Sequence, residues 1–329
     1  MRSERGSRPA PQGGPGGPSR RDFLKTSAVA AAAVGIGLPL SARRATAAIQ
    51  PLPASRSGLF AAHGVTVAPS GAIFVADSGN YRVRSFDADL RPASEFGRPG
   101  FGPGLLNYPT GVDVGPDGLV YVADTNNGRI CRFRQDGAFV DEIGSLGGAV
   151  GCFFTPQAVR VGPDGTIYVV NTRGHNVQVL EPGGKRVRAA YGILGDDPPT
   201  LAPGDVTYAF RLPTDCAVLP GGKLWVLDSK HGAIKRLAAD GGYEGVLANA
   251  DPSVALDRPQ AMVLVGRKLF VCDTGNGRIV AFDLENGRAD ALKSPEGLRE
   301  PTGIAADGHG RLIVADAQSP TPYAIEANP

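Results

Sequence analysis

The sequence of 329 residues has none of the short motifs that mark hydrolases with a serine nucleophile, nucleotide-binding loops or cysteine-held clusters. Gly-x-Ser-x-Gly, the phosphate-binding loop and Cys-x-x-Cys are all missing, so no nucleophile, haem or metal-cluster motif can be assigned. Gly-rich pieces such as residues 97–104 separate apolar segments, where turns require glycine. We therefore predict no catalytic residues and no cofactor from motifs alone.

Long apolar runs are also missing. The longest, Thr26 to Leu40, holds 15 residues, several of them Gly, Ala or Pro. A membrane-spanning helix needs about 20 strongly apolar residues. No cysteine follows this run, so a lipid anchor is not indicated, and a cleaved segment is favoured over a membrane anchor.

The first 47 residues have the organisation of an export signal. Residues 1–18 are mostly Gly, Pro, Arg and Ser, a composition that cannot form a core. Ser19-Arg20-Arg21-Asp22-Phe23-Leu24-Lys25 then precedes the apolar run, which is followed by the small-residue cleavage pattern Ala45-Thr46-Ala47. This segment resembles a twin-arginine signal. The resemblance implies folding before export, a periplasmic or extracellular destination, and contact with a membrane only during export.

Removal of residues 1–47 changes the net charge. Eight of the 34 basic and two of the 32 acidic residues lie there, so residues 48–329 carry 26 basic and 30 acidic residues, a net charge of −4. A weakly acidic chain is a poor candidate for nucleic-acid binding. We expect no nucleic-acid partner.

A repeated segment accounts for most of the remaining sequence. Its second apolar run ends in Asp or Asn at intervals of 47, 47, 57, 45 and 43 residues. Such periods indicate a repeat architecture. The repeats start near residues 63, 109, 156, 213, 259 and 301, and their marker residues are Asp77, Asp124, Asn171, Asp228, Asp273 and Asp316.

The apolar runs within the repeats predict β-strands. Runs such as Leu119 to Val122 and Leu224 to Leu227 are too short for helices and rich in β-branched and aromatic residues. Being apolar on both faces, each small sheet must lie between two others, as in a propeller. From about His63 to Ile325 the pattern resembles the NHL-repeat family of six-bladed propellers, and we predict one all-β, six-bladed propeller over residues 48–329. We expect Ile49 to Phe60 to complete the last blade and close the ring.

Regular residues of the repeat are interpreted as structural. The Asp that ends each second strand can bind turn N–H groups and the Arg five residues later. This predicts three turn pairs: Asp77 with Arg82, Asp124 with Arg129, and Asp273 with Arg278. Asn80, Asn127 and Asn276 are interpreted as turn formers.

Irregular residues are the candidates for function. Blade three has Asn171 in place of Asp and carries Arg173 and His175 in its turn, while blade four has Lys230 and His231. An insertion, Tyr191 to Phe210, lies between them. We hypothesise that a ligand or partner binds this sector, although solvated loop residues explain the same pattern.

The channel mouth offers a second site. His63, Thr110, Gln157, Thr214, Gln260 and Thr302 stand at the start of the first strands, and Asp215 follows Thr214. Gln157, Thr214 and Asp215 are therefore further binding candidates. This mouth is polar but almost uncharged. Its candidate ligands for a divalent metal are His63 and Asp215, whereas zinc normally takes at least three protein ligands.

Four cysteines in an exported protein raise the question of disulfides. Cys131 and Cys272 fall among apolar neighbours and are interpreted as free buried thiols, Cys152 lies between blades, and a Cys216–Cys272 bridge is an alternative.

Two functions remain open at this point. The first is an exported, non-catalytic propeller that presents one face to a protein, peptide or glycan partner. The second is a metal-dependent lyase or hydrolase at the channel mouth, similar to peptidyl-hydroxyglycine amidating lyases or lactonases.

Overall fold

The computed structural model describes residues 58–192, 209–247, 254–292 and 297–327. Predictions about the signal segment and its cleavage, and about most of Ile49 to Phe60 and of the insertion before blade four, fall outside these ranges. In the described part of the chain no helix is long and apolar enough to cross a membrane.

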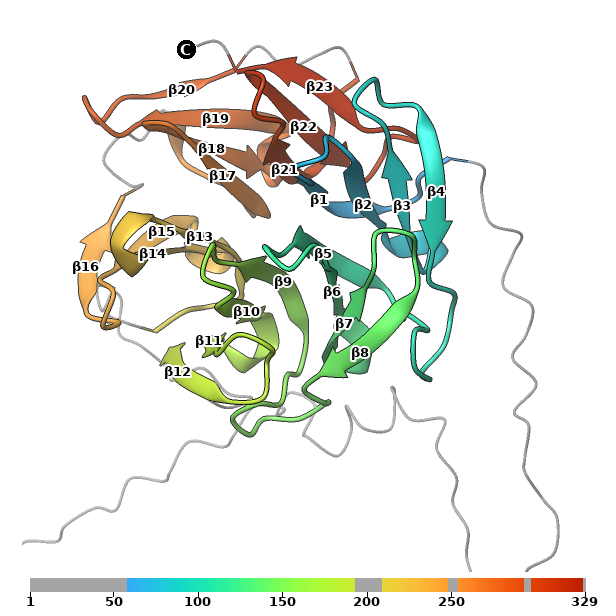
Figure 1. The fold of residues 1–329 in the computed structure, drawn as a ribbon. Coiled ribbons are helices and arrows are strands. Elements are labelled where there is room, and N and C mark those ends of the chain that lie inside the picture. The colour runs from blue at the N-terminus through green and yellow to red at the C-terminus, as the bar shows by residue number, and fades with distance from the viewer. Residues whose placement is uncertain (1–57, 193–208, 248–253, 293–296, 328–329) are drawn as a thin grey trace, which may run out of the picture. The chain divides into compact units, whose positions relative to one another are not determined.

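Six antiparallel sheets surround a common axis (Figure 1). Each of the first five has four strands in sequence order, and the sixth has three. The strands of blades one to three are β1 Ala62–Val67, β2 Ile73–Asp77, β3 Arg82–Phe86, β4 Pro92–Phe96, β5 Pro109–Val114, β6 Val120–Asp124, β7 Arg129–Phe133, β8 Phe139–Ile143, β9 Pro156–Val161, β10 Ile167–Asn171, β11 Asn176–Leu180 and β12 Val187–Gly192. Those of blades four to six are β13 Pro213–Val218, β14 Leu224–Asp228, β15 Ala233–Leu237, β16 Tyr243–Val246, β17 Ala261–Val265, β18 Lys268–Asp273, β19 Arg278–Asp283, β20 Ala289–Ala291, β21 Pro301–Ala306, β22 Arg311–Asp316 and β23 Tyr323–Glu326.

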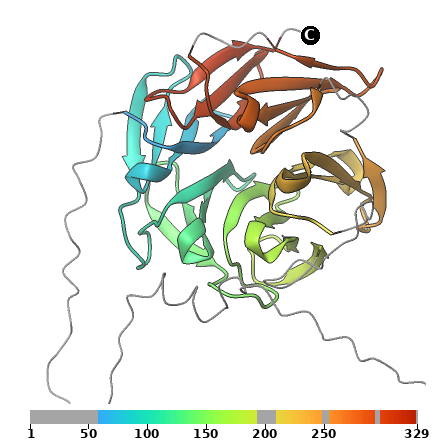
Figure 2. The same cartoon turned by 180° about the vertical axis from the view of Figure 1, so that it is seen from behind.

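The all-β, six-bladed fold predicted from the repeats is confirmed. The first strand of each blade lies innermost, and the view from behind shows the same ring (Figure 2). The ring closes because β1 contacts β21, the innermost strands of blades one and six. Among the described residues the last sheet gains no fourth strand from the N-terminal side; instead, the Leu59 N–H donates to Pro320 O at 2.8 Å.

The core lies between blades rather than within them. One cluster joins Phe74 and Phe96 of blade one to Val120 and Phe133 of blade two. Equivalent buried clusters occupy every other junction, including that between blades six and one. This packing explains why the strands are apolar on both faces, since each sheet is covered on both sides.

Short turns define the two ends of the ring. A 3-10 turn follows the second strand in blades one to five: Ser78–Asn80, Thr125–Asn127, Thr172–Gly174, Ser229–His231 and Thr274–Asn276. These turns and the segments leading into the first strands lie at the same end, which we call the mouth side. The turns between strands one and two, such as Gly115 to Gly118, lie at the opposite end.

Candidate functional site

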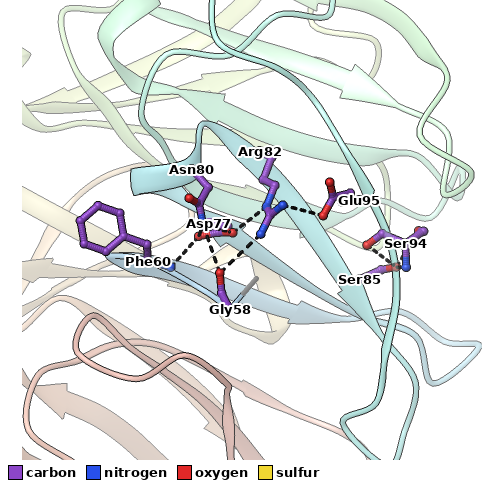
Figure 3. A network of polar contacts seen from close by, with 8 residues as sticks. All are labelled: Gly58, Phe60, Asp77, Asn80, Arg82, Ser85, Ser94 and Glu95. Atoms are coloured by element: carbon purple, nitrogen blue, oxygen red, sulfur yellow. Dashed lines mark hydrogen bonds and ion pairs between the residues drawn. The ribbon is translucent and has the colours of Figure 1, made fainter. Parts of the chain in front are cut away.

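The three predicted turn pairs form ion pairs on the mouth side. The Nε of Arg82 lies 2.7 Å from Asp77 Oδ2 (Figure 3), and the equivalent distances are 2.9 Å for Arg129 to Asp124 and 2.7 Å for Arg278 to Asp273. Arg82 and Arg129 also reach a glutamate on the fourth strand. The Asn three residues after each Asp donates to the same carboxylate.

The marker residue of every repeat has a second role that the sequence did not reveal. One of its side-chain oxygens accepts a backbone N–H from the segment leading into the first strand of the same blade, as in Phe60 to Asp77 at 2.8 Å. The remaining donors are Asn107, Phe154, Arg211, Asp257 and Arg299, at 2.6 to 2.9 Å. Asn171 serves this role as well as Asp does, because an amide oxygen also accepts. The substitution in blade three therefore keeps the lead-in segment in place.

A cycle of hydroxyl hydrogen bonds links each blade to the next. At every junction a Ser or Thr hydroxyl donates to the carbonyl oxygen of the residue that begins the next blade. The six donors and acceptors are Ser78 to Pro109, Thr125 to Pro156, Thr172 to Pro213, Thr214 to Pro259, Thr274 to Pro301 and Thr302 to Ala62. Thr214, a binding candidate from the sequence, is thus a buried inter-blade donor.

The axial cavity is small. It is lined by the residues that the sequence placed at the mouth, among them His63, Gln157 and Asp215, and its volume is about 20 Å³. Ligand pockets for small molecules span roughly 300–1,000 Å³. Gln157 narrows the mouth further, since its Nε2 donates to Gln260 Oε1 at 2.6 Å. The cavity has room for about one water molecule.

Asp215 lies on the axis with two charged side chains that were not predicted from the sequence, Arg160 and Asp113. Arg160 makes two hydrogen bonds to the Asp215 carboxylate, at 2.9 and 2.6 Å. Asp113, in the blade before Arg160, accepts from Thr66 and from the Val161 backbone. Burial raises the pKa of Asp113, and the nearby guanidinium of Arg160 opposes that shift. One guanidinium on the axis, that of Arg160, thus faces two carboxylates, Asp113 and Asp215.

His63 and Asp215, the two candidate metal ligands, are each held by other protein groups. His63 Nδ1 lies 2.9 Å from Ala61 O and 3.0 Å from Ser78 Oγ, and its ring packs edge-on against Tyr108. Burial lowers the pKa of His63. Asp215 is held by Arg160 and by the Cys216 and Met262 N–H groups. The described residues contain no group of three or more His, Cys, Asp or Glu side chains placed to hold a metal.

The two binding candidates of blade three, His175 and Arg173, differ in exposure. His175 is buried at the left-handed end of its turn, with φ of 52°, and its Nδ1 accepts the Leu212 N–H at 3.2 Å. Burial lowers the pKa of His175. Arg173 is exposed, and its backbone N–H is held by Thr155 Oγ1. His175 therefore ties blade three to the lead-in segment of blade four, and little of its ring is accessible to a partner.

Blade four has a lysine and a histidine at the carboxylate that lacks its arginine. His231 Nδ1 and Lys235 Nζ both lie 2.8 Å from Asp228 Oδ2. Lys235 is fully buried, donates to Ala209 O, and lies over the Phe210 ring at 5.7 Å from its centroid. Lys235 was not predicted as a site residue, although a lysine within the apolar strand Ala233–Leu237 is the signal that could have revealed it.

All four cysteines are free thiols, so the Cys216–Cys272 bridge does not form. Cys131, Cys216 and Cys272 are buried, and burial raises the pKa of each thiol. These residues act as small apolar side chains in the core.

Comparison with known proteins agrees with this geometry. The NHL repeat model matches residues 62–86 and 106–133, and the twin-arginine translocation signal model matches residues 17–37. No curated protein matches the chain.

Solved structures of other propellers resemble the fold at low sequence identity. A streptogramin B lyase aligns with a TM-score of 0.55 and 15% identity, covering 80% of this chain and 92% of its own. A gluconolactonase from Xanthomonas campestris gives 0.61 and 15%, with 82% and 86% covered. A chain of a nidogen/laminin complex gives 0.57 and 16%, with 78% and 86% covered. Identities this low show the fold alone.

These observations define the class of protein as a six-bladed β-propeller. More particularly, the chain is an NHL-repeat propeller with a twin-arginine signal sequence, which indicates export by the twin-arginine pathway.

Proposed function

We propose that this exported propeller is a binding protein that presents its mouth side, over blades three and four, to a protein, peptide or glycan partner. The observation that carries the proposal is the axial cavity of about 20 Å³, which is too small to hold a small-molecule substrate at the channel mouth. The departures from the repeat, in contrast, place Arg173, Lys230 and His231 on the exposed mouth side. Partner binding on an open face is the function that this arrangement supports best.

The test is capture of a partner on that face. The exported protein would carry a photo-crosslinking amino acid at Lys230 or, as a matched control, at Lys185 in a turn on the opposite side. Both positions are exposed. We expect specific crosslinks from position 230 to one recurring partner. Equal crosslinking from both positions, or none from position 230, would overturn the proposal.

Metal analysis tests the alternative of a lyase or hydrolase. Protein purified without chelator should contain substoichiometric zinc and calcium if the face is only a binding surface. One tightly bound divalent ion per chain, lost together with hydrolytic or lyase activity on chelation, would favour the enzyme instead.

A further inference from the structure

A second cavity lies at the end of the ring opposite the mouth, between blades one and two. Its volume is about 380 Å³, which falls within the range of small-molecule pockets. Most of its wall comes from the turns and strands of blade one, and one side chain comes from a turn of blade two. The lining includes Ser70, Ala72, Ser85, Asp87 and Ala93 of blade one, together with Gln135 of blade two.

Comparison with blade two explains why blade one has room for this cavity. The two repeats have the same spacing and strand register, since Ala62 pairs with Asp77 and Pro109 pairs with Asp124. Each lining residue of blade one therefore has a counterpart 47 positions later. At three of these positions blade one has the smaller side chain. The three pairs are Ala72 with Leu119, Ser85 with Arg132, and Ala93 with Val140.

The counterpart of Ser85 in blade two is a largely buried arginine. Arg132 makes two hydrogen bonds to the Asp141 carboxylate, at 2.6 and 2.5 Å, and lies over the Tyr121 ring at 5.7 Å from its centroid. In blade one the same two positions are serines, and the hydroxyl oxygens of Ser85 and Ser94 lie 2.7 Å apart (Figure 3). A short hydroxyl pair therefore stands where blade two has a guanidinium and its carboxylate.

The cavity has one exposed carboxylate in its wall, that of Asp87. Its Oδ1 accepts the N–H groups of Asp89 and Arg91, at 2.9 and 2.8 Å. Its Oδ2 lies 3.8 Å from Arg91 Nη1, which is beyond hydrogen-bond distance, and the same nitrogen lies only 2.6 Å from Asp89 Oδ2. Among the described residues no donor is thus hydrogen-bonded to Asp87 Oδ2. This oxygen can accept a hydrogen bond from a ligand.

The charges near this oxygen favour a cation. The turn that begins with Asp87 contributes two carboxylates and one guanidinium, a net charge of −1. Arg311 of blade six, which donates to the backbone of this turn, is paired with Asp307 at 2.6 Å. In the neighbouring turn of blade two, Arg134 lies 3.9 Å from Asp136. Both of these guanidinium groups therefore have a carboxylate of their own beside them.

We propose that this cavity binds a small, free guanidinium compound with a short aliphatic stem. The guanidinium would donate to Asp87 Oδ2, because its planar fork of N–H groups matches a carboxylate. The stem would pack against Ala72 and Ala93. Blade two supports this class of ligand, since it holds the same chemical group, on Arg132, at the position that Ser85 occupies in blade one. The site lies at the end opposite the proposed partner-binding face, so neither proposal depends on the other.

A guanidinium compound fits the cavity better than three other classes of ligand. An anion would be repelled by the carboxylate of Asp87. A neutral apolar compound would remove water from Asp87 Oδ2 without supplying a donor. A sugar ring commonly stacks on an exposed aromatic face, whereas the two aromatic residues in the wall, Phe74 and Phe86, are each only 1% accessible.

The experiment titrates the exported protein with propylguanidinium, which reproduces an arginine side chain, and measures the dissociation constant by ligand-observed NMR. Asp87→Asn keeps the oxygen that caps the turn but removes the charge, so it should weaken binding by about fivefold or more. The matched control is Asp283→Asn. Asp283 stands at the same position of blade five and caps its turn in the same way, accepting the Glu285 N–H at 2.8 Å. This variant should bind within about twofold of wild type.

Two further arms test the cavity and the charge of the ligand. The Ala72→Leu/Ala93→Val variant introduces the residues that blade two has at these positions and should lose saturable binding while keeping a cooperative unfolding transition. Propylurea, the neutral isostere, should bind wild type at least about fivefold more weakly than propylguanidinium.

Four results would overturn the inference. They are absence of saturable binding by wild type, equal affinity for propylurea, equal weakening by Asp87→Asn and Asp283→Asn, and unchanged binding by a folded Ala72→Leu/Ala93→Val variant. If that double variant does not fold, the other three comparisons decide. Crosslinking from position 230 is unaffected by any of these results, so the proposed binding function is tested separately.

Discussion

The partner of the buried Asp differs between blades, yet the structure of the turn is the same. In blades one, two and five a guanidinium neutralises the buried Asp from five residues away. Blade four has Ala233 at that position and instead uses Lys235, which reaches the same carboxylate from two residues further along the strand. In each of these blades a cationic side chain therefore neutralises the buried Asp, although its type and its position in the repeat differ in blade four.

The Lys235→Met variant tests this exchange. It removes the buried ammonium and leaves Asp228 with only His231 and the Arg211 N–H as partners, so we expect a loss of about 3–5 kcal/mol in the free energy of unfolding. Urea denaturation would measure it. The control Lys223→Met breaks an exposed pair with Glu244 and should cost no more than about 1 kcal/mol.

A double variant checks the cause of the effect. Combining Lys235→Met with Asp228→Asn removes both charges, so its destabilisation should be smaller than the sum of the two single losses. Additive losses would show that packing, rather than an uncompensated carboxylate, explains the role of Lys235.

At the level of elements, the sequence predicted the strands well because their apolar character follows directly from burial between neighbouring sheets. Val122 and Val226, for example, lie in predicted strands and are fully buried. Contacts between side chains of different blades could not be predicted in this way. Arg160 and Asp215 stand in different blades, 55 residues apart, and their ion pair depends on how the ring brings the first strands together. Spacing along one repeat carries no information about such contacts.

The hydroxyl bonds between blades give a prediction at the same scale. Thr172→Val keeps the shape of the side chain but removes the donor to Pro213 O, a bond of 2.7 Å in a buried junction. We expect a loss of about 1–3 kcal/mol in unfolding free energy, because the carbonyl oxygen loses its buried partner.

An exposed threonine serves as the control for this variant. Thr321→Val should change the unfolding free energy by less than about 0.5 kcal/mol. Equal effects at the two positions would mean that the valine itself, and not the lost hydroxyl, is responsible.

For the whole molecule, closure depends on close contact between the first and last blades. A Cβ atom on Gly303 would lie 2.1 Å from His63 O, so β21 can approach β1 only without a side chain there. Gly303→Val should therefore lower the unfolding free energy by about 3 kcal/mol. Calorimetry would register a matching fall in the melting temperature.

The equivalent position in blade five provides the comparison. Ala261 already carries a Cβ atom in β17, and Ala261→Gly should cost only about 1 kcal/mol. If Gly303→Val were as mild, closure would not depend on this contact.

The contact between β1 and β21 also constrains when the protein can fold. β1 begins at Ala62 and β21 begins at Pro301, so a growing chain cannot close the ring until β21 has left the ribosome. We therefore expect the complete propeller to form only after the blade that contains β21 has been synthesised. A pathway that transports folded proteins is compatible with this closed ring. A translocase that threads an unfolded chain would first have to separate β1 from β21.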